Sequence, residues 1–285
     1  MTKAIKTIAV AGAGTMGAGI AQITAQAGYR TLLYDVNVDM LQKAQTGLEK
    51  TWQALVAKGK LTQEQAAISA ANVNYTTQAN DLVCDLVIEA IVEKLPIKQE
   101  FFKTVAAINS SDTILATNTS SIPVTQIAAA VPQPGRFLGI HFFNPAPVMK
   151  LVEIISGAET DKAIADYCTT FIASLGKTCV QAADAPGFIV NRVARHYYVE
   201  ALKILEEGVS DVQAIDTLME NSGFKMGPFR LMDLIGVDTN FSVTSSMYNL
   251  FHQDGKFRPS RIQQQKVDAG HHGRKTGKGF YTYEK

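Results

Sequence analysis

IKTIAVAGAGTMG, residues 5–17, is the stretch that decides the fold of this chain. Its first seven residues form the apolar run of a buried strand, and a helical pattern follows the glycines as far as Gly28. A GxGxxG motif is weak evidence alone, but between a strand and a helix it is typical of a loop that binds a dinucleotide. The alternative is a glycine-rich turn without a ligand. The residues predicted to contact the cofactor are Gly12, Gly14, Thr15, Met16 and Gly17.

Asp35 ends the next short apolar strand pattern, residues 31–35. A carboxylate at this position accepts hydrogen bonds from the ribose hydroxyls of the cofactor and repels a 2′-phosphate. No arginine follows it directly, since the next residues are Val36 and Asn37. We therefore expect NAD rather than NADP, unless Asp35 is only a loop or cap residue.

Strand and helix patterns alternate through the first part of the chain, which predicts a parallel sheet with helices on both faces. Strands are expected at residues 82–90, 113–117, 136–141, 149–155 and 178–181, and helices at 38–58, 97–108 and 163–175. The strands 136–141 and 149–155 are expected at the sheet edge. The predicted class is α/β, with a Rossmann-like, mostly parallel sheet domain over residues 1–184.

Strand patterns stop at the segment 184–187, so residues 185–285 are predicted to form a smaller, all-helical domain. Helices are expected at residues 190–207, 211–221, 228–250 and 260–269. Ser210 and Gln213 have the spacing of a capping box before the second of these helices. The apolar faces of the helices make this domain a candidate surface for a homodimer.

Composition and charge exclude several classes of protein. A chain of 285 residues with 46% hydrophobic content has the composition of an ordinary folded protein. The net charge of +1 gives no support to nucleic-acid or anionic-membrane binding. No apolar run reaches the ~18 residues of a membrane-spanning helix. The three cysteines fit no zinc motif and no targeting segment precedes the first strand, so we expect a cytoplasmic protein without a metal site.

His141 and Glu153 are the strongest candidates for proton transfer. His141 ends a strand pattern, and strand ends are where open α/β sheets gather their sites. If the two strands form an antiparallel hairpin, the carboxylate reaches the imidazole from behind, where it fixes the tautomer and supports a positive charge. The structural alternatives are a packed histidine and an ion pair of Glu153 with Lys150 or Arg136 on the surface.

Two polar segments also follow element boundaries. Residues 118–121, Asn-Thr-Ser-Ser, come directly after a predicted strand and can simply cap the helix that starts near Pro123. Asn191 lies in the first turns of the long helix that opens the second domain, where its amide faces either a cleft or solvent.

Taken together, these motifs resemble one family, the L-3-hydroxyacyl-CoA dehydrogenases of the short bacterial 3-hydroxybutyryl-CoA type. The resemblance covers nearly the whole chain, with several long motifs in order and at the family's spacing. It rests on residues 12–17, 85–94, 118–121, 141–153, 186–192, 226–238 and 273–283.

The resemblance implies a role for each site residue. His141 takes the proton of the substrate's 3-hydroxyl while hydride passes from C3 to the nicotinamide, and Glu153 orients His141. Ser120 and Asn191 hydrogen-bond the region of the reacting oxygen and hold the substrate. The further residues implied for the cofactor site are Asp35, Glu93, Lys98, Asn118 and Asn144.

The resemblance also implies a helical hairpin over the acyl-CoA substrate at residues 38–70. Lys50 and Lys58 are its candidates for phosphate binding, although each can equally lie on a solvated helix face. Some relatives carry a further lysine where this chain has Ala54. Another departure is His271-His272, where relatives often have a bulky apolar pair.

Three alternatives remain open. Lys225 or Arg230 can pair with a distal carboxylate, as in a 3-hydroxyadipyl-CoA dehydrogenase of aromatic-acid degradation. A dehydrogenase of a free hydroxy acid would share the same two domains. A non-catalytic dinucleotide-binding protein is the alternative of another class.

Overall fold

The computed structural model describes residues 4–284, and these divide into two compact units between Ala185 and Pro186. Within residues 4–284, none of the helices combines the length and the apolar character that crossing a membrane requires.

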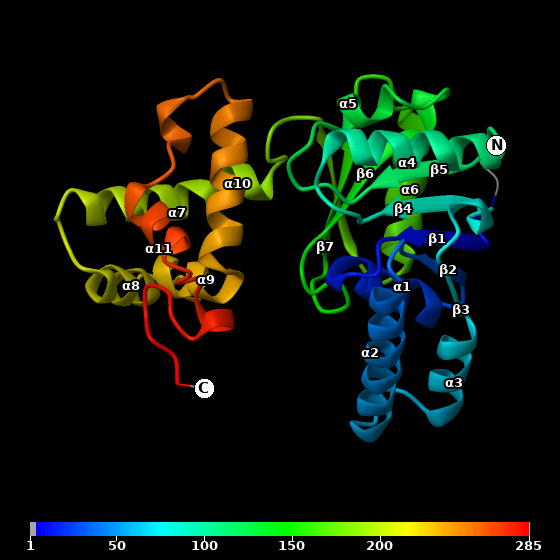
Figure 1. Ribbon diagram of the computed structural model, residues 1–285, viewed down its shortest axis with the longest axis horizontal. Helices are drawn as coiled ribbons and strands as arrows, with labels where there is room; N and C mark the ends of the chain where they lie inside the picture. Colours follow the sequence, from blue (N-terminus) through cyan, green and yellow to red (C-terminus); the bar gives the residue numbers. More distant parts are fainter. Residues whose placement is uncertain (1–3, 285) are drawn as a thin grey trace. The chain divides into compact units, whose positions relative to one another are not determined.

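The first unit is built on one eight-stranded sheet with the order β3-β2-β1-β4-β5-β6-β7-β8 (Figure 1). The strands are β1 Thr7–Ala11, β2 Arg30–Tyr34, β3 Val73–Thr76, β4 Leu86–Glu89, β5 Ile114–Thr117, β6 Phe137–Phe142, β7 Leu151–Ser156 and β8 Thr178–Ala183. Every neighbouring pair is parallel except β6 and β7, which are antiparallel. The predicted α/β class with a mostly parallel sheet is confirmed.

Two details of the sheet differ from the prediction. Residues 73–76 form β3 beside β2, although no strand is expected there, because only Val73 of its four residues is buried and no apolar run marks it. β6 and β7 lie inside the sheet rather than at its edge, since β8 pairs with β7 and forms that edge.

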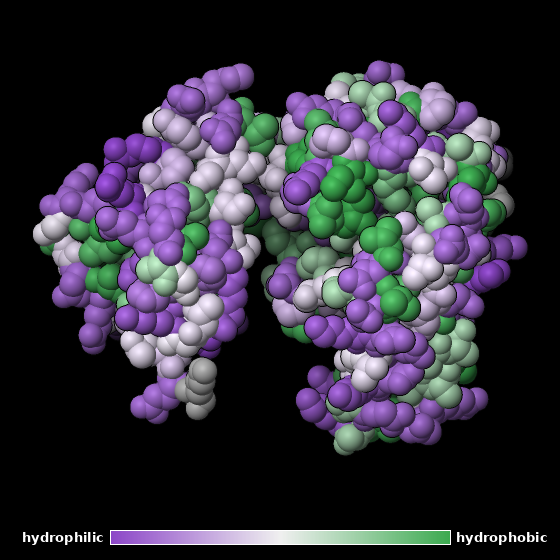
Figure 2. Space-filling view, in the orientation of Figure 1, coloured by the Kyte–Doolittle hydropathy of each residue, from purple (hydrophilic) through white to green (hydrophobic). Residues whose placement is uncertain are grey.

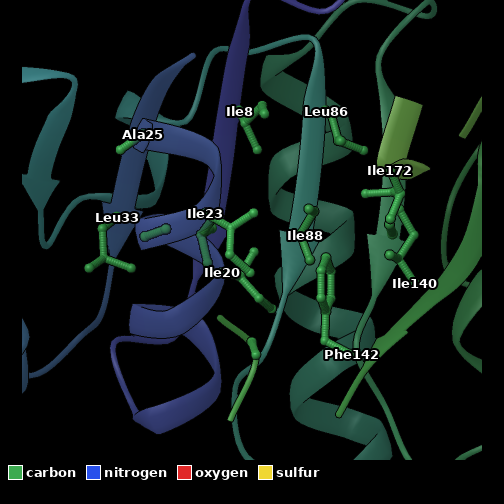
Figure 3. Close-up of a cluster of buried hydrophobic side chains, with 14 of the residues drawn as sticks. Ile8, Ile20, Ile23, Ala25, Leu33, Leu86, Ile88, Ile140, Phe142 and Ile172 are labelled. Carbon is green, nitrogen blue, oxygen red and sulfur yellow. The ribbon is translucent and has the colours of Figure 1, made fainter. Parts of the chain in front are cut away.

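Helices cover the sheet on both faces. The helices of this unit are α1 Thr15–Gln26, α2 Val38–Ala57, α3 Gln63–Ala71, α4 Leu95–Ile108, α5 Val124–Ala128 and α6 Lys162–Ser174. On one face, α1 and α6 bury apolar side chains against the strands; Figure 3 shows Ile20, Ile88, Ile140 and Ile172 among them. Each such side chain stabilises the fold by roughly 1.5–3 kcal/mol through burial. Helices α2 and α3 pack against each other and project away from the sheet (Figure 1).

The alternation of side chains along the strands sets which residues leave this apolar face. Residues 86 and 88 of β4, 138, 140 and 142 of β6, and 152 and 154 of β7 belong to the core of α1 and α6. Because successive side chains of a strand point to opposite faces, Glu89, Thr117, His141 and Glu153 all point to the other face. On that face Phe102 of α4 packs edge-on against Phe137.

The second unit contains the helices α7 Val190–Glu206, α8 Val212–Asn221, α9 Pro228–Ile235, α10 Val237–Leu250 and α11 Arg261–Asp268. They enclose a separate core that includes Tyr198, Leu202, Phe229 and Met232. The predicted helical second domain is confirmed. The C-terminal segment adds isolated β-bridges from Lys278 to Gly273 and Thr282.

Two local predictions for this unit are wrong. The expected helix 228–250 is two helices, because Gly236 takes a φ of 107° that only glycine adopts readily. The cap of α8 is Asp211 rather than Ser210, since the Asp211 carboxylate accepts the backbone N–H of Ala214 at 2.8 Å.

Buried carboxylates hold the second unit together. Asp216 accepts the backbone N–H groups of Phe229 and Arg230 and the hydroxyl of Tyr281, which fixes the start of α9. Asp233 accepts the backbone N–H groups of Phe280 and Tyr281 and the hydroxyl of Tyr283. The C-terminal segment is therefore tied to α9 rather than loosely attached.

Candidate active site

His141 and Glu153 face each other across the antiparallel pair of β6 and β7. They are direct partners in the register, and His141 Nδ1 lies 2.8 Å from Glu153 Oε2. Both are buried, with 3% and 1% of their surface exposed. A buried carboxylate accepts the Nδ1 proton, which favours the tautomer whose Nε2 carries no proton.

Ser120 occupies the Nε2 side of the same imidazole. It follows β5, and its Oγ lies 3.1 Å from His141 Nε2. The neighbouring ring of Phe143 lies 4.6 Å from the imidazole, measured between centroids. The structure thus brings three of the four predicted catalytic residues into one hydrogen-bonded chain, Glu153–His141–Ser120.

The loop that carries Ser120 is bound by Glu93. Glu93 Oε1 accepts the hydroxyl of Thr119 at 2.5 Å, the backbone N–H groups of Ser120 and Ser121 at 3.1 and 3.2 Å, and the Ser121 hydroxyl at 3.0 Å. Its other oxygen, Oε2, lies 3.1 Å from Lys98 Nζ. Glu93 therefore joins the loop after β4 to the loop after β5.

Lys98 is enclosed between two carboxylates. Its side chain is 1% exposed, and its Nζ lies 2.5 Å from Oε1 of the fully buried Glu89. Glu89 also accepts the hydroxyl of Thr117 and the backbone N–H of Ile91. Glu89 has a sequence signal, since it is an acid at the end of an apolar strand as Asp35 is, but that signal alone indicates no partner.

Burial and charge move the pKa values of the two carboxyls in opposite directions. Burial raises the pKa of Glu89 above its ordinary value, although the charge of Lys98 opposes it. Burial also acts to raise the pKa of Glu93, but the charge of Lys98 and the hydrogen bonds to the carboxylate outweigh it. The pKa of Glu93 is lowered as a result.

The glycine loop has the shape that a pyrophosphate needs. Gly12 has a φ of 98°, and a Cβ there would overlap the backbone carbonyl of Ala90. A Cβ on Gly17 would overlap the carbonyl oxygen of Gly12. At Gly14 a Cβ would meet nothing within 4 Å, so that side of the backbone is open at the N-terminus of α1.

Asp35 lies directly after β2 and is braced by the backbone. Its Oδ2 accepts the N–H of Ala13 and its Oδ1 accepts the N–H of Asn37. Each carboxylate oxygen keeps a second lone pair for a ribose hydroxyl. Asp35 thereby stands beside the glycine loop.

A cavity of about 920 Å³ opens next to Asp35 and Gly14. Its walls are mostly apolar and include the exposed side chains of Val36, Val92 and Ile97. Figure 2 shows apolar surface on the visible face of this unit, below helix α4. Open glycine backbone, a braced carboxylate and apolar walls together fit the adenosine and pyrophosphate of a dinucleotide.

The remaining predicted cofactor residues lie at the ends of β5 and β6. Asn118 Oδ1 accepts the N–H of Phe142 at 2.8 Å, which ties the two strands together. Asn144 is exposed in the turn between β6 and β7. Lys177, which has no predicted role, holds this turn by donating to the carbonyls of Ala146 and Met149 at 2.6 and 2.9 Å.

The predicted phosphate-binding lysines do not share one place. Lys50 lies on α2 in a shallow hollow of about 400 Å³ that Lys43 also lines. A second hollow of about 480 Å³ connects Lys43 with Gly14 and Thr15. Lys58 is the C-cap residue of α2 and lines neither hollow.

The other predicted residues belong to the second unit. Asn191 is half-buried in the first turn of α7, and its contact with substrate stays a prediction. Arg230 Nη1 is 2.8 Å from both carboxylate oxygens of Glu220. Lys225 is exposed.

Comparison with known families and proteins gives consistent matches along the chain. The model of the "3-hydroxyacyl-CoA dehydrogenase, NAD binding domain" matches residues 7–185, and that of the "3-hydroxyacyl-CoA dehydrogenase, C-terminal domain" matches residues 187–283.

Curated relatives and solved structures agree with these families. The 3-hydroxyadipyl-CoA dehydrogenase of Escherichia coli is 45% identical over 98% of this chain, which spans only 59% of that relative's length. A probable 3-hydroxybutyryl-CoA dehydrogenase of Deinococcus radiodurans is 41% identical over 96% of this chain and 99% of its own. The crystal structure of (S)-3-hydroxybutyryl-CoA dehydrogenase from Ralstonia eutropha superposes with a TM-score of 0.94, at 38% identity, covering 99% of this chain and all of that one.

Proposed function

The chain belongs to the 3-hydroxyacyl-CoA dehydrogenase family, and from that premise we propose that it interconverts short-chain (S)-3-hydroxyacyl-CoA and 3-ketoacyl-CoA with NAD. The observation that carries this proposal is the hydrogen-bonded chain Glu153–His141–Ser120 at the strand ends of an NAD-binding domain. Relatives named 3-hydroxybutyryl-CoA dehydrogenase, matched along nearly their full length, support the short acyl chain.

We propose that His141 moves the proton. With Nδ1–H held by Glu153, Nε2 carries the lone pair that accepts the 3-hydroxyl proton during oxidation, on the side of the ring where Ser120 Oγ lies. Glu153 then stabilises the imidazolium by a charge-assisted hydrogen bond across 2.8 Å. NAD, when bound, supplies the acceptor for the hydride that leaves C3.

Ser120 and Asn191 are proposed to hold the reacting oxygen, since Ser120 Oγ already lies at hydrogen-bond distance from Nε2. Gly12, Gly14 and Asp35 are proposed to bind the pyrophosphate and the adenosine ribose. Phosphates of the acyl-CoA are proposed to meet Lys50 and Lys58, of which Lys50 shares a surface hollow with Lys43.

A steady-state assay tests this function directly. The assay compares a panel of 3-ketoacyl-CoA substrates with NADH and with NADPH. We expect acetoacetyl-CoA to drive the oxidation of NADH, with little oxidation of NADPH. His141→Ala should lower kcat by about 10²–10⁴-fold, the usual range for a general acid or base. Undiminished turnover in that variant would refute the catalytic assignment, and absent turnover in the wild type would favour a non-catalytic dinucleotide-binding protein.

A second candidate substrate is 3-hydroxyadipyl-CoA, which the name of the Escherichia coli relative favours. Exposed Lys225 remains available for a distal carboxylate, whereas Arg230 is already engaged by Glu220. We expect Lys225→Ala to lower kcat/KM for 3-hydroxyadipyl-CoA but not for 3-hydroxybutyryl-CoA. A strong wild-type preference for the four-carbon substrate would reject this candidate.

We also propose a cytoplasmic homodimer. Exposed apolar side chains of the second unit support association through it: Val193 on α7, Leu218 on α8 and Phe224 in the segment between α8 and α9. The buried thiols of Cys84 and Cys168 accord with a reducing compartment. Light scattering after gel filtration measures the mass directly, and a mass near 31 kDa, that of one chain, would contradict the dimer.

A further inference from the structure

One carboxylate oxygen of Glu93 accepts several of the hydrogen bonds that hold the loop carrying Ser120. Four donors from three consecutive residues, Thr119 to Ser121, converge on Glu93 Oε1 at 2.5–3.2 Å. Two of them are backbone N–H groups, so the carboxylate fixes the course of the chain as well as its side chains.

Lys98 gives the carboxylate of Glu93 a second point of attachment. The side chain of Glu93 is 39% exposed, and its second carboxylate oxygen, Oε2, lies 3.1 Å from the buried Lys98 Nζ. Lys98 is in turn held at 2.5 Å by Glu89, which is fully buried at the end of β4. Lys98 thus links Glu93, and with it the loop that carries Ser120, to the end of β4.

Ser120 contacts both Glu93 and His141 of the proposed proton-transfer pair. Its backbone N–H is bound by Glu93, while its Oγ lies 3.1 Å from His141 Nε2. Anchoring of the Ser120 backbone sets the place from which the Oγ reaches the imidazole. A hydroxyl displaced by about 1 Å would no longer lie within hydrogen-bond distance.

We infer that Glu93, held by Lys98, is a positioning residue that keeps Ser120 Oγ at hydrogen-bond distance from His141 Nε2. This role differs from the cofactor contact that the family resemblance implies for both residues, and it makes a different prediction. Its kinetic consequence rests on the proposed function, whereas the contact it describes exists in the free protein.

Nitrogen NMR of the free protein tests the contact without any substrate. In protein labelled with ¹⁵N at its five histidines, the His141 signals are identified by their loss in His141→Asn. Ser120→Ala should shift the Nε2 resonance, because it removes the neighbouring hydroxyl. We expect Glu93→Ala to move the resonance towards the same position, and the double variant to match Ser120→Ala.

Matched variants make the result specific. Glu159→Ala removes an exposed glutamate of the same unit and should leave the Nε2 resonance at its wild-type position. Ser121→Ala removes one of the four donors and should cause a smaller shift in the same direction, which keeps the test available if Glu93→Ala does not fold. The inference is overturned if Nε2 stays at its wild-type position in Ser120→Ala, or in the Glu93 and Ser121 variants.

Kinetics provide the second readout. Misplacement of Ser120 should lower kcat of Glu93→Ala by about 10- to 100-fold, while the Kd of NADH changes by less than about three-fold. Glu93→Gln, which keeps an oxygen for the four donors, should recover part of the loss. A large rise in the Kd of NADH with unchanged kcat would assign Glu93 to cofactor binding alone and overturn the inference. If no 3-ketoacyl-CoA is turned over, the proposed function fails, while the NMR result still decides the contact.

Discussion

The two nitrogens of His141 have different partners, and this difference determines what the residue can do. Nδ1 is bound by the buried carboxylate of Glu153, and Nε2 faces the hydroxyl of Ser120. An ionised carboxylate can accept hydrogen bonds but cannot donate them, so it selects the tautomer of the ring with a proton on Nδ1. An amide in its place can donate as well as accept, and it would lose that selection.

Glu153→Gln should therefore damage turnover rather than binding. We expect kcat to fall by at least about 100-fold, because the amide permits the tautomer with a proton on Nε2 and no longer stabilises the imidazolium. The Kd of NADH, measured by fluorescence titration, should stay within about two-fold of wild type. Equal losses in kcat and in NADH affinity would contradict a role confined to His141.

We propose that Asp35 sets the selectivity for NAD over NADP. Asp35→Ala removes the carboxylate that neighbours the glycine loop, so KM for NAD should rise and discrimination against NADP should relax. Asp112→Ala, which removes an exposed aspartate far along the sequence, serves as the control. Unchanged selectivity in Asp35→Ala would remove Asp35 from the cofactor site.

At the scale of elements, loops after neighbouring strands are joined by charge as well as by the sheet. Glu93 lies after β4 and accepts hydrogen bonds from the loop after β5, and Lys98 of α4 forms an ion pair with it. These contacts together are the Glu93 clasp. The lowered pKa of Glu93 makes this clasp sensitive to acid. A carboxyl whose pKa is lower in the folded chain adds stability above its ordinary value of 4.5 and loses it as the pH falls through the folded value.

The stability difference between wild type and Glu93→Gln should follow that rule. We expect the wild type to have the higher Tm at pH 6, and the difference to shrink steadily as the pH is lowered from 4.5 towards 3. Glu89 is present in both proteins, so its raised pKa does not distinguish them. A difference in Tm that is the same at pH 6 and pH 3 would argue against the clasp.

Elements with a clear apolar or periodic pattern could be predicted from the sequence, whereas elements without such a pattern could not. β1, β4 and β5 are nearly continuous apolar runs and were expected, whereas half-exposed β3 has no such run. The break at Gly236 depends on a positive φ inside a helical pattern, which composition alone does not reveal.

The site divides in the same way. His141 and Glu153 could be paired because they lie on adjacent strands joined by one short turn. The contacts of Glu93 with residues 119–121 span 26–28 positions and depend on how two loops pack. Glu89 and Lys177 have a visible sequence signal, an acid that ends an apolar strand and a lysine directly before a strand, but neither signal identifies the partner of the residue.

At the scale of the whole molecule, the second unit has its own core and its own buried charge. Asp233, 1% exposed, accepts three hydrogen bonds from the C-terminal segment, and a Cβ on Gly279 would overlap its carboxylate. The cofactor loop and the His141–Glu153 pair lie wholly in the first unit. Damage at Asp233 should therefore affect the two units unequally.

Asp233→Ala should lower the free energy of unfolding of the second unit by roughly 2–4 kcal/mol, because three donors lose their buried acceptor. Limited proteolysis should cut residues 186–284 earlier than in wild type, while NADH still binds at low temperature. Peptide mapping by mass spectrometry locates the first cleavage. Early cleavage within residues 4–185, or loss of NADH binding at low temperature, would show that the units are not separable in this way.

The pairing of His141 with Glu153 in the β6–β7 register also limits where the length of the chain can change during evolution. One residue inserted within either strand turns the following side chains to the opposite face and separates the imidazole from its carboxylate. Residues added to the turn at 143–150 leave the register untouched. Homologues that retain the activity should therefore vary in length at this turn, or compensate a strand insertion with a bulge, but should not shift one strand against the other.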